Sequence, residues 1–460
     1  MNRLLLLYII FFASATCTAE IVVPTIFSDN MVLQRNTDVF IYGWANPNEE
    51  FTLYTSWNDE MKNVKAGTDA KWRVQMSTPA AGGPYSIQLK GMANDITLNN
   101  VLIGEVWLCS GQSNMEWSAN AGIDNKDVEI ANAHYPNIRL FTVAKRASAY
   151  PQEDVFGNWE VTTPETMANF SAVAYFFAKK LQEELNIPIG LIDASWGASC
   201  AEVWTPKVVF DEYPELAEAH GLIKPNQWVT IEKSVLYNGM IAPLTDFQIG
   251  GVLWYQGESN TGNAETYQKL FSAMIRAWRT KWDTDLPFYY AQIAPFKYGR
   301  TYAGGVVRDQ QRRTLELENT GMAMTSDICT IEDIHPQNKQ DVGLRLANIA
   351  LKEHFQTLGQ EVYGPSIKTA ITDGSQMSLT FDHNDGLYLK EGNSDLFELR
   401  DEQGNWHVAK AKLKSKGIVL QTKAVKEPQA VRFAWKSTDI SNLFNAAGLP
   451  ASTFKVELND

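Results

Sequence analysis

Hydrophobic and polar positions alternate in short runs along the first hundred residues of the chain. The alternation is clearest at 85–89, and β-prone runs at 39–42 and 72–76 precede it. Turn-forming residues such as Gly82–Gly83–Pro84 separate these runs. Alternation predicts strands that bury one face, and several short strands between turns are typical of a small sandwich. We therefore predict an N-terminal β domain over residues 20–100.

The pattern changes between about residues 101 and 360, where apolar runs alternate with stretches of helical spacing. This alternation predicts a parallel sheet with helices on both faces. Ligands of such sheets bind at the carboxyl ends of the strands, so polar motifs directly after these strands are the first candidates for a site. The expected strands are 101–108, 189–193, 250–255, 288–293 and 322–326, and the expected helices are 171–186, 264–282, 306–317 and 340–355.

Short β-prone runs return after about residue 361, which predicts a C-terminal β region over 361–460. The runs at 378–381 and 387–389 flank Asn384–Asp385–Gly386, a strong turn signal, so we expect them to form a hairpin. Further strands are expected at 418–421 and 431–434.

The N-terminus has the pattern of a secretory signal peptide, residues 1–19. Arg3 precedes an apolar run at 4–13, and small and polar residues follow up to Ala19, where cleavage is expected. The run is too short to span a bilayer, which takes roughly 20 apolar residues. We therefore expect an exported protein, periplasmic or extracellular, with no integral membrane segment after cleavage. The alternatives are a buried N-terminal strand and lipid anchoring at Cys17, which Thr16 disfavours.

Composition narrows the range of partners. The chain has 40 Lys+Arg against 53 Asp+Glu, a formal net charge of -13, and no basic block, which argues against nucleic acid or an anionic membrane. Cys109, Cys200 and Cys329 are too widely spaced for a disulfide framework, and which two of them pair, if any, stays open. The chain lacks CxxC and HExxH motifs, so we expect no metal centre.

A candidate nucleophile follows the first strand of the predicted parallel sheet. The strand at 101–108 leads into Ser110–Gly111–Gln112–Ser113–Asn114. A serine on a tight turn at the end of such a strand is where α/β hydrolases place their nucleophile. Gly111 allows the sharp turn, because it has no Cβ. The alternative is a structural turn rich in Ser and Asn.

Histidine is the natural base for such a serine, because its pKa lies near neutrality. The chain has only six histidines. His335 lies in a loop after the strand at 322–326, and the carboxylates Glu332 and Asp333 precede it. A lone histidine is ordinarily a core or surface residue, but the others have no setting at a strand end: His134, His220, His354, His383 and His407.

Two more strand ends carry polar loops. After the strand at 250–255, Gln256 and Asn260 offer hydrogen bonds to an oxyanion, and Glu258 offers an acid partner for a histidine. This run also suits an N-terminal cap for the following helix. After the strand at 189–193, Gly197 offers a backbone N–H, although this loop also suits packing around Trp196. Together the loops predict one crevice at the carboxyl edge of the sheet.

Several of these motifs, in this order, resemble the sialate O-acetylesterase family of SGNH (GDSL-like) hydrolases. The similarity extends from about residue 22 to the C-terminus. It rests on Gly111–Gln112–Ser113–Asn114–Met115, 188–193, 236–244, 254–260, Asp333–Ile334–His335–Pro336 and 442–450.

The resemblance implies an α/β fold: a flavodoxin-like SGNH-hydrolase α/β/α sandwich with accessory β-sandwich-like regions at both ends. It implies Ser113 as nucleophile and His335 as general base. The oxyanion hole would use the N–H groups of Ser113 and Gly197 with the side chain of Gln256 or Asn260. No metal or organic cofactor is implied.

The acid partner of His335 is not fixed by the resemblance. We order the candidates Asp333, Glu258, Glu332, and a Ser–His dyad with a backbone carbonyl is the alternative. The chain also departs from the family at Ala198, because the family usually has Gly–Gly–Thr where this chain has Gly–Ala–Ser. Alanine keeps the N–H, so the oxyanion role survives unless φ must be positive there.

The predicted function is that of a serine esterase that removes O-acetyl groups from carbohydrate through an acetyl-serine intermediate. The first substrate candidate is 9-O-acetylated sialic acid, and acetylxylan or another acetylated hemicellulose is the alternative. A non-catalytic glycan-binding protein is a further alternative, against which the intact Ser113 and His335 argue. A sialic acid carboxylate needs a cation close to it. Arg308, Arg312 and Arg345 are candidates, although the sequence does not tell where they lie relative to the site. The oligomeric state is not predicted.

Overall fold

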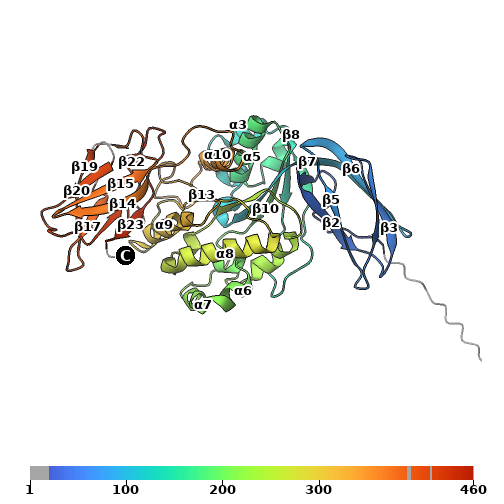
Figure 1. Ribbon diagram of the computed structural model, residues 1–460, viewed down its shortest axis with the longest axis horizontal. Helices are drawn as coiled ribbons and strands as arrows, with labels where there is room; N and C mark the ends of the chain where they lie inside the picture. Colours follow the sequence, from blue (N-terminus) through green and yellow to red (C-terminus); the bar gives the residue numbers. More distant parts are fainter. Residues whose placement is uncertain (1–19, 391–394, 415–416, 459–460) are drawn as a thin grey trace, which may run out of the picture.

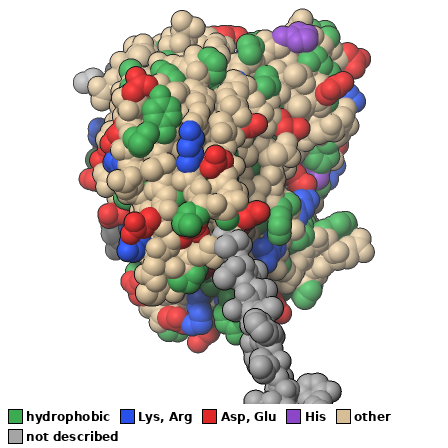
Figure 2. Space-filling model, turned by 90° about the vertical axis from the view of Figure 1, so that its right-hand side faces the viewer, with side chains coloured by type: hydrophobic (Ala, Val, Ile, Leu, Met, Phe, Trp, Pro, Cys, Tyr) green, Lys and Arg blue, Asp and Glu red, His purple; other side chains and the backbone are tan. Residues whose placement is uncertain are grey.

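The computed structural model describes residues 20–390, 395–414 and 417–458. The predicted signal peptide, with Cys17, lies outside these residues. The molecule is elongated: N-terminal strands, a central α/β part and C-terminal strands follow one another along its long axis (Figure 1). Figure 2 shows the N-terminal end, where acidic, basic and hydrophobic side chains are interspersed. Among the described residues, no helix is long and apolar enough to cross a membrane.

The N-terminal part consists of two facing sheets. Phe51 and Trp72, one from each sheet, meet with ring centroids 5.1 Å apart. Val39 and Ile41 are buried on alternate positions of one strand, which is the pattern that predicted a half-buried sheet. The strands expected at 39–42, 72–76 and 85–89 are confirmed. The strands are β1 (Val32–Gln34), β2 (Asp38–Trp44), β3 (Glu50–Thr55), β4 (Glu60–Lys65), β5 (Lys71–Ser77) and β6 (Gly82–Lys90).

One long strand, β7 (Asp95–Gly111), joins this part to the central sheet. Its first half pairs with β6, and its second half lies between β10 and β11. The predicted boundary between residues 100 and 101 therefore falls inside a strand. Residues 101–111 are all buried. The segment that follows β7 starts from the middle of the sheet, and this position fixes Ser113 in the fold.

The central sheet has the order β13-β12-β11-β7-β10-β8-β9, and only β9 in this row runs antiparallel to its neighbour. Taken in chain order, β7, β10, β11, β12 and β13 lie in the sequence 2-1-3-4-5, and β8 lies parallel to β10 outside these five strands. The predicted parallel strands are confirmed, although the last one ends before residue 326. Their bounds are β8 (Tyr135–Thr142), β9 (Trp159–Thr162), β10 (Ile189–Ser195), β11 (Gly251–Tyr255), β12 (Phe288–Ala291) and β13 (Thr320–Ala323).

Helices cover both faces of this sheet, with α3, α5 and α10 on one side and α6 to α9 on the other (Figure 1). Ser171 caps α5 as predicted, because its Oγ accepts the N–H of Ala174 at 3.2 Å. The helices are α1 (Ser113–Glu116), α2 (Ala119–Gly122), α3 (Lys126–Ala131), α4 (Pro164–Met167), α5 (Ala172–Leu185), α6 (Lys207–Glu212), α7 (Pro214–His220), α8 (Tyr267–Trp282), α9 (Ala303–Arg313) and α10 (Lys339–Ile349).

The C-terminal part contains two 4-stranded sheets and one strand pair. Phe381 and Phe454 lie on different sheets with their ring centroids 6.0 Å apart, so the sheets face each other. The strands are β14 (Ser366–Asp373), β15 (Gln376–Asp382), β16 (Tyr388–Leu389), β17 (Phe397–Arg400), β18 (Trp406–Val408), β19 (Lys410–Lys414), β20 (Gly417–Gln421), β21 (Ala430–Phe433), β22 (Leu443–Phe444) and β23 (Phe454–Glu457).

The hairpin expected across Asn384–Asp385–Gly386 is wrong. The strand before the turn, β15, has β14 and β20 on its two edges, and the strand after it, β16, pairs with β22. The turn signal is real, since Gly386 has a φ of 61°. Both edges of β15 are occupied, so the chain leaves this sheet after the turn.

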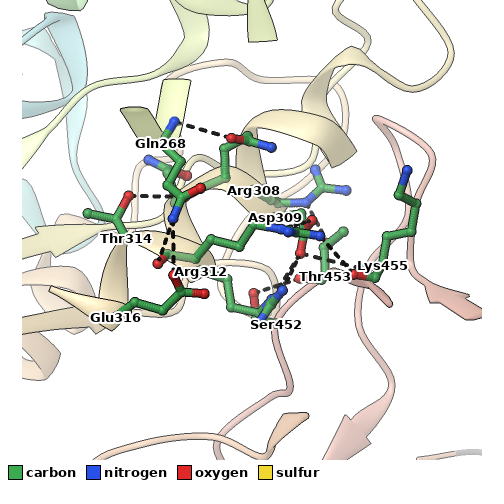
Figure 3. A network of polar contacts seen from close by, with 12 residues as sticks. Gln268, Arg308, Asp309, Arg312, Thr314, Glu316, Ser452, Thr453 and Lys455 are labelled. Carbon is green, nitrogen blue, oxygen red and sulfur yellow. Dashed lines mark hydrogen bonds and ion pairs between the residues drawn. The ribbon is translucent and has the colours of Figure 1, made fainter. Parts of the chain in front are cut away.

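The C-terminal part is fastened to α9 by a buried polar network (Figure 3). The guanidinium of Arg308 is fully buried, and its Nε donates to Thr453 Oγ1 at 2.9 Å. Asp309 Oδ1 accepts the N–H of Lys455 at 3.3 Å and the Nε of Arg312 at 2.9 Å. Arg308 thus bonds α9 to the C-terminal part directly, whereas Arg312 is paired with Asp309 within α9.

The cysteines of the described chain are not paired with one another. Cys109, Cys200 and Cys329 are free thiols. Burial raises the pKa of the Cys109 thiol well above its ordinary value, so this thiol stays protonated and unreactive.

Candidate active site

Ser113 and His335 meet at the carboxyl edge of the central sheet. Ser113 begins α1 immediately beyond β7, and the chain turns sharply at Gly111, whose φ is 137°. A Cβ at Gly111 would lie 2.3 Å from the carbonyl oxygen of Tyr255, so only glycine fits. His335 lies between β13 and α10, and its Nε2 is 2.8 Å from Ser113 Oγ. The two residues chosen from the sequence are thus in hydrogen-bond contact.

The surroundings of His335 favour the neutral imidazole. Trp117 stacks on the ring with centroids 4.2 Å apart. Burial lowers the pKa of His335, the positive charge of Lys339 lowers this pKa further, and Asp333 opposes the change. A neutral imidazole is the form that accepts a proton from a hydroxyl group.

This environment predicts the pH dependence of the reaction. The base is active when it is unprotonated, so lowering its pKa moves the acid limb of kcat/KM below the ordinary histidine value of about 6.5. We expect turnover of an aryl acetate to persist through that pH and to fall at more acidic pH. The measurement is kcat/KM against pH, with a stability check at each point. A midpoint at or above the ordinary value would contradict the assignment of His335 as base.

The carboxylates predicted as acid partners lie in different settings. Asp333 Oδ1 accepts the backbone N–H of His335 at 2.8 Å, so Asp333 shapes the loop that carries the base. Glu332 is largely exposed and lies 3.5 Å from Lys297 Nζ, facing solvent. Glu258 is buried, and burial raises its pKa. Its Oε1 accepts from Asn114 Nδ2 at 2.6 Å, and its Oε2 has no hydrogen-bond partner in the described chain.

Asn114 and Lys339 belong to the site and were missed in the sequence. Asn114 Nδ2 also donates to the carbonyl oxygen of Ile334 at 2.9 Å, and its Oδ1 accepts from Lys339 Nζ. Lys339 is buried at the start of α10, and burial lowers its pKa to about 7. Asn114 therefore ties Glu258, Lys339 and the loop of His335 into one buried network. Its place directly after Ser113 is the only sequence signal that pointed to it.

The side chains proposed for the oxyanion hole are used for internal bonds. Gln256 and Asn260 are fully buried. Gln256 Nε2 donates to Asn260 Oδ1 at 2.8 Å, and Asn260 Nδ2 donates to Glu202 Oε2 at 2.9 Å. These amides hold neighbouring loops together, and Gln256 Nε2 also donates to Oε1 of Gln112, the residue before Ser113, at 3.2 Å. The residue types predicted that these side chains can donate hydrogen bonds, but not which acceptors they bond to.

The backbone of Gly197 does lie against Ser113, since a Cβ at Gly197 would be 3.4 Å from the Ser113 Cβ. Its N–H donates to Glu116 Oε2 at 2.6 Å. Glu116 Oε1 in turn accepts from Lys145 Nζ at 2.6 Å. The Glu116 carboxylate therefore accepts the hydrogen bond of the Gly197 N–H, the group that was expected to bind the oxyanion.

The next residue, Ala198, has a φ of 61°, in the left-handed region. A positive φ makes the departure from the family's Gly–Gly–Thr matter, because a residue with a Cβ, such as Ala198, is disfavoured in the left-handed region. We expect Ala198→Gly to stabilise the fold by roughly 0.5–1 kcal/mol, since relief of strain exceeds the entropy gained by the unfolded chain. Urea unfolding of the two proteins measures this difference. A less stable variant would show that the strain at residue 198 is small.

A cavity of about 440 Å³ opens at Ser113, and its lining mixes apolar residues such as Trp117 and Val143 with the polar residues Ser113, Glu116, Lys145, Asp193 and Ser195. Ser195 Oγ donates to Asp193 Oδ1 at 2.6 Å. Burial raises the pKa of Asp193 to about 7, and the negative charge of Glu116 raises it further. The hydrogen bond from Ser195 lowers this pKa, but by less. Such a lining suits the hydroxyl groups of a sugar.

The cations suggested for a sialic acid carboxylate are elsewhere. Arg308 and Arg312 belong to the network beneath the C-terminal part. Arg345 binds Asp327 through both oxygens, at 2.7 and 2.6 Å. Each guanidinium is already held by partners that the sequence pattern does not reveal, which argues against all three suggestions.

Comparisons with known proteins agree with this geometry. Residues 103–352 match the family model for carbohydrate esterases described as sialic acid-specific acetylesterase. Human sialate O-acetylesterase is 30% identical over 365 residues, covering 69% of this chain and 68% of the human protein. The mouse sialate O-acetylesterase is 28% identical over 481 residues, covering 89% and 88%.

Among solved structures, a carbohydrate acetylesterase from Xanthomonas citri superimposes with a TM-score of 0.87 at 33% sequence identity, covering 95% of this chain and 100% of that one. The fold and these relatives define a carboxylic ester hydrolase. The chain belongs to the carbohydrate esterase family of sialic acid-specific acetylesterases.

Proposed function

We propose that this protein is a serine esterase that removes O-acetyl groups from carbohydrate through an acetyl-Ser113 intermediate. The observation that carries the proposal is the 2.8 Å contact between Ser113 Oγ and His335 Nε2. The flavodoxin-like order of the central strands supports an SGNH-type catalytic domain. Family membership supports carbohydrate deacetylation as the reaction class.

The reaction proceeds in two balanced steps. His335 takes the proton of the Ser113 hydroxyl as Oγ attacks the acetyl carbonyl, and the N–H groups of Ser113 and Gly197 hold the oxyanion. His335 then gives this proton to the leaving sugar oxygen, which departs as a hydroxyl. Water next attacks the acetyl-serine, with His335 again as base, and releases acetate and free Ser113.

We propose Asp333 as the first acid partner, with Glu258 second. Asp333 holds the backbone of His335 and raises the pKa of its ring, whereas Glu258 acts through Asn114. Asp333→Asn should lower kcat roughly tenfold, the change that about 1.4 kcal/mol of transition-state energy produces. Glu258→Gln should lower it less.

The measurement is kcat for p-nitrophenyl acetate, with thermal unfolding of each variant. Glu332→Gln should change little, because that carboxylate faces Lys297. Glu153→Gln, which alters an exposed ion pair with Lys71, is the matched control. If neither Asp333→Asn nor Glu258→Gln lowers turnover, a Ser–His dyad replaces the triad.

For the substrate, family membership supports 9-O-acetylated sialic acid, whereas one observation favours a neutral acetylated glycan such as acetylxylan. The cavity beside Ser113 has Glu116 and Asp193 in its lining, and Lys145, a cation there, is already paired with Glu116. An anionic sugar meets like charge there mainly from Glu116, because Asp193, with a pKa of about 7, is partly protonated at neutral pH. Acetate release from both substrates should be measured side by side. Release from xylan alone would refute the sialate substrate, and the reverse would refute the neutral glycan.

We also propose that the protein is exported, with cleavage after Ala19. The support is the cationic, apolar and small-residue pattern of residues 1–19.

A further inference from the structure

The oxyanion donor of Gly197 is occupied by a side chain of the same chain. Gly197 N–H donates to Glu116 Oε2 at 2.6 Å. A backbone N–H has one hydrogen, so it cannot serve this carboxylate and a substrate oxyanion at the same time. Glu116 is the last residue of α1, the short helix that Ser113 begins. The nucleophile and the group that covers its oxyanion donor are therefore carried by the same turn of helix.

Glu116 has a second hydrogen-bond partner, which belongs to the lining of the cavity. Its Oε1 accepts from Lys145 Nζ at 2.6 Å. The two side chains are 36% and 43% exposed, so neither is locked by packing. Both residues line the 440 Å³ cavity with Ser113, Asp193 and Ser195. A ligand in this cavity touches Glu116 itself and Lys145, one of the two partners that hold it.

We propose that Glu116 is a specificity-determining residue that covers the oxyanion donor until a sugar enters the cavity. Sugar hydroxyls donate to the Glu116 carboxylate and replace the Gly197 N–H as its partner, while Lys145 keeps the charge on the far side. The freed N–H then donates a hydrogen bond to the acetyl carbonyl oxygen. The departure of Glu116 also removes a negative charge from the place where the oxyanion develops, which the reaction requires.

This arrangement discriminates between esters. An acetylated sugar brings the hydroxyl donors that displace Glu116, whereas an aryl acetate has none and must compete with the carboxylate unaided. Binding energy from the sugar is thus spent on completing the catalytic site, which is induced-fit specificity. The inference rests on the proposed esterase function and names how that site selects glycan acetyl groups.

The test compares kcat/KM for p-nitrophenyl acetate and for an acetylated xylo-oligosaccharide, or for 9-O-acetyl sialic acid if that is the substrate. Glu116→Ala should raise the value for the aryl acetate about tenfold and lower the preference for the sugar by at least the same factor. Glu116→Gln keeps an oxygen that accepts from Gly197, so its values should lie nearer to wild type than those of Glu116→Ala. Glu153→Ala, which removes the glutamate of an exposed Glu–Lys pair, is the control.

Two results would overturn the inference: unchanged aryl acetate turnover in Glu116→Ala, or an equal loss for both substrates. Comparing the thermal unfolding of Glu116→Ala with that of Glu153→Ala shows whether a loss of activity for both substrates comes from misfolding. Ser113→Ala, assayed in parallel, tests the proposed function by itself. If it retains activity, the nucleophile is wrong. If it is inactive while Glu116→Ala keeps the wild-type preference, only the role of Glu116 fails.

Discussion

Ser113→Ala should lower kcat for p-nitrophenyl acetate by roughly 10⁴- to 10⁶-fold, the range seen when a serine hydrolase loses its nucleophile. The variant lacks the oxygen that receives the acetyl group, while the surrounding N–H donors remain. Its fold should be unchanged, because the Ser113 hydroxyl contacts only the His335 ring through a hydrogen bond in the described chain. Turnover and thermal unfolding, measured on the same preparation, check both statements.

Ser110→Ala is the matched control for this variant. Ser110 lies in the same motif, but its Oγ donates to the carbonyl oxygen of Ala194 at 2.7 Å and faces away from the reaction. We expect a loss of stability in this variant without loss of chemistry in the folded protein. Equal rates for wild type and Ser113→Ala would refute Ser113 as the nucleophile. An inactive wild type would favour a glycan-binding protein.

Asn114→Ala should be the most destabilising single change in the site, by about 3 kcal/mol. It leaves Lys339 Nζ and Glu258 Oε1 buried without this partner, and each buried polar group that loses its hydrogen bond costs about 1–3 kcal/mol. It also releases the carbonyl of Ile334, so the loop of His335 loses a tether. A displacement of about 1 Å at a catalytic group can cost about 100-fold in rate, and we expect a loss of that order in kcat.

Urea unfolding and kcat should be measured together for Asn114→Ala. Asn120→Ala is the control, because Asn120 is an exposed asparagine nearby whose Nδ2 donates to Asn169 Oδ1. Its stability should stay within about 0.5 kcal/mol of wild type. If Asn114→Ala is as stable and active as this control, the buried network does not position His335.

Five strands of the central sheet, β7 and β10 to β13, could be predicted because their signals are local, whereas β8 and β9 were not predicted. A buried parallel strand is a short apolar run, and an amphipathic helix such as α5 has its own period and cap. The carboxyl-edge rule then identified Ser113, which follows β7. Elimination among six histidines identified His335. Both steps needed only the order of strands along the chain.

The remaining contacts depend on partners that are distant in sequence. Asn114 meets Ile334 across 220 residues, and Arg308 meets Thr453 across 145. No local pattern shows that an amide such as Gln256 bonds to another loop, as its Nε2 does to Ser199 and Asn260. For the same reason nothing in the sequence indicated the role of Glu116, three residues after Ser113, because its partner Gly197 is 81 residues away.

The most direct measurement is to quench wild-type enzyme during turnover of saturating p-nitrophenyl acetate and to locate the acetyl group by peptide mass spectrometry. We predict acetylation of Ser113 during turnover, its disappearance when substrate is exhausted, and its absence in Ser113→Ala. Acetylation of a different residue that is lost at the rate of turnover would contradict Ser113 as the residue that carries the acetyl group.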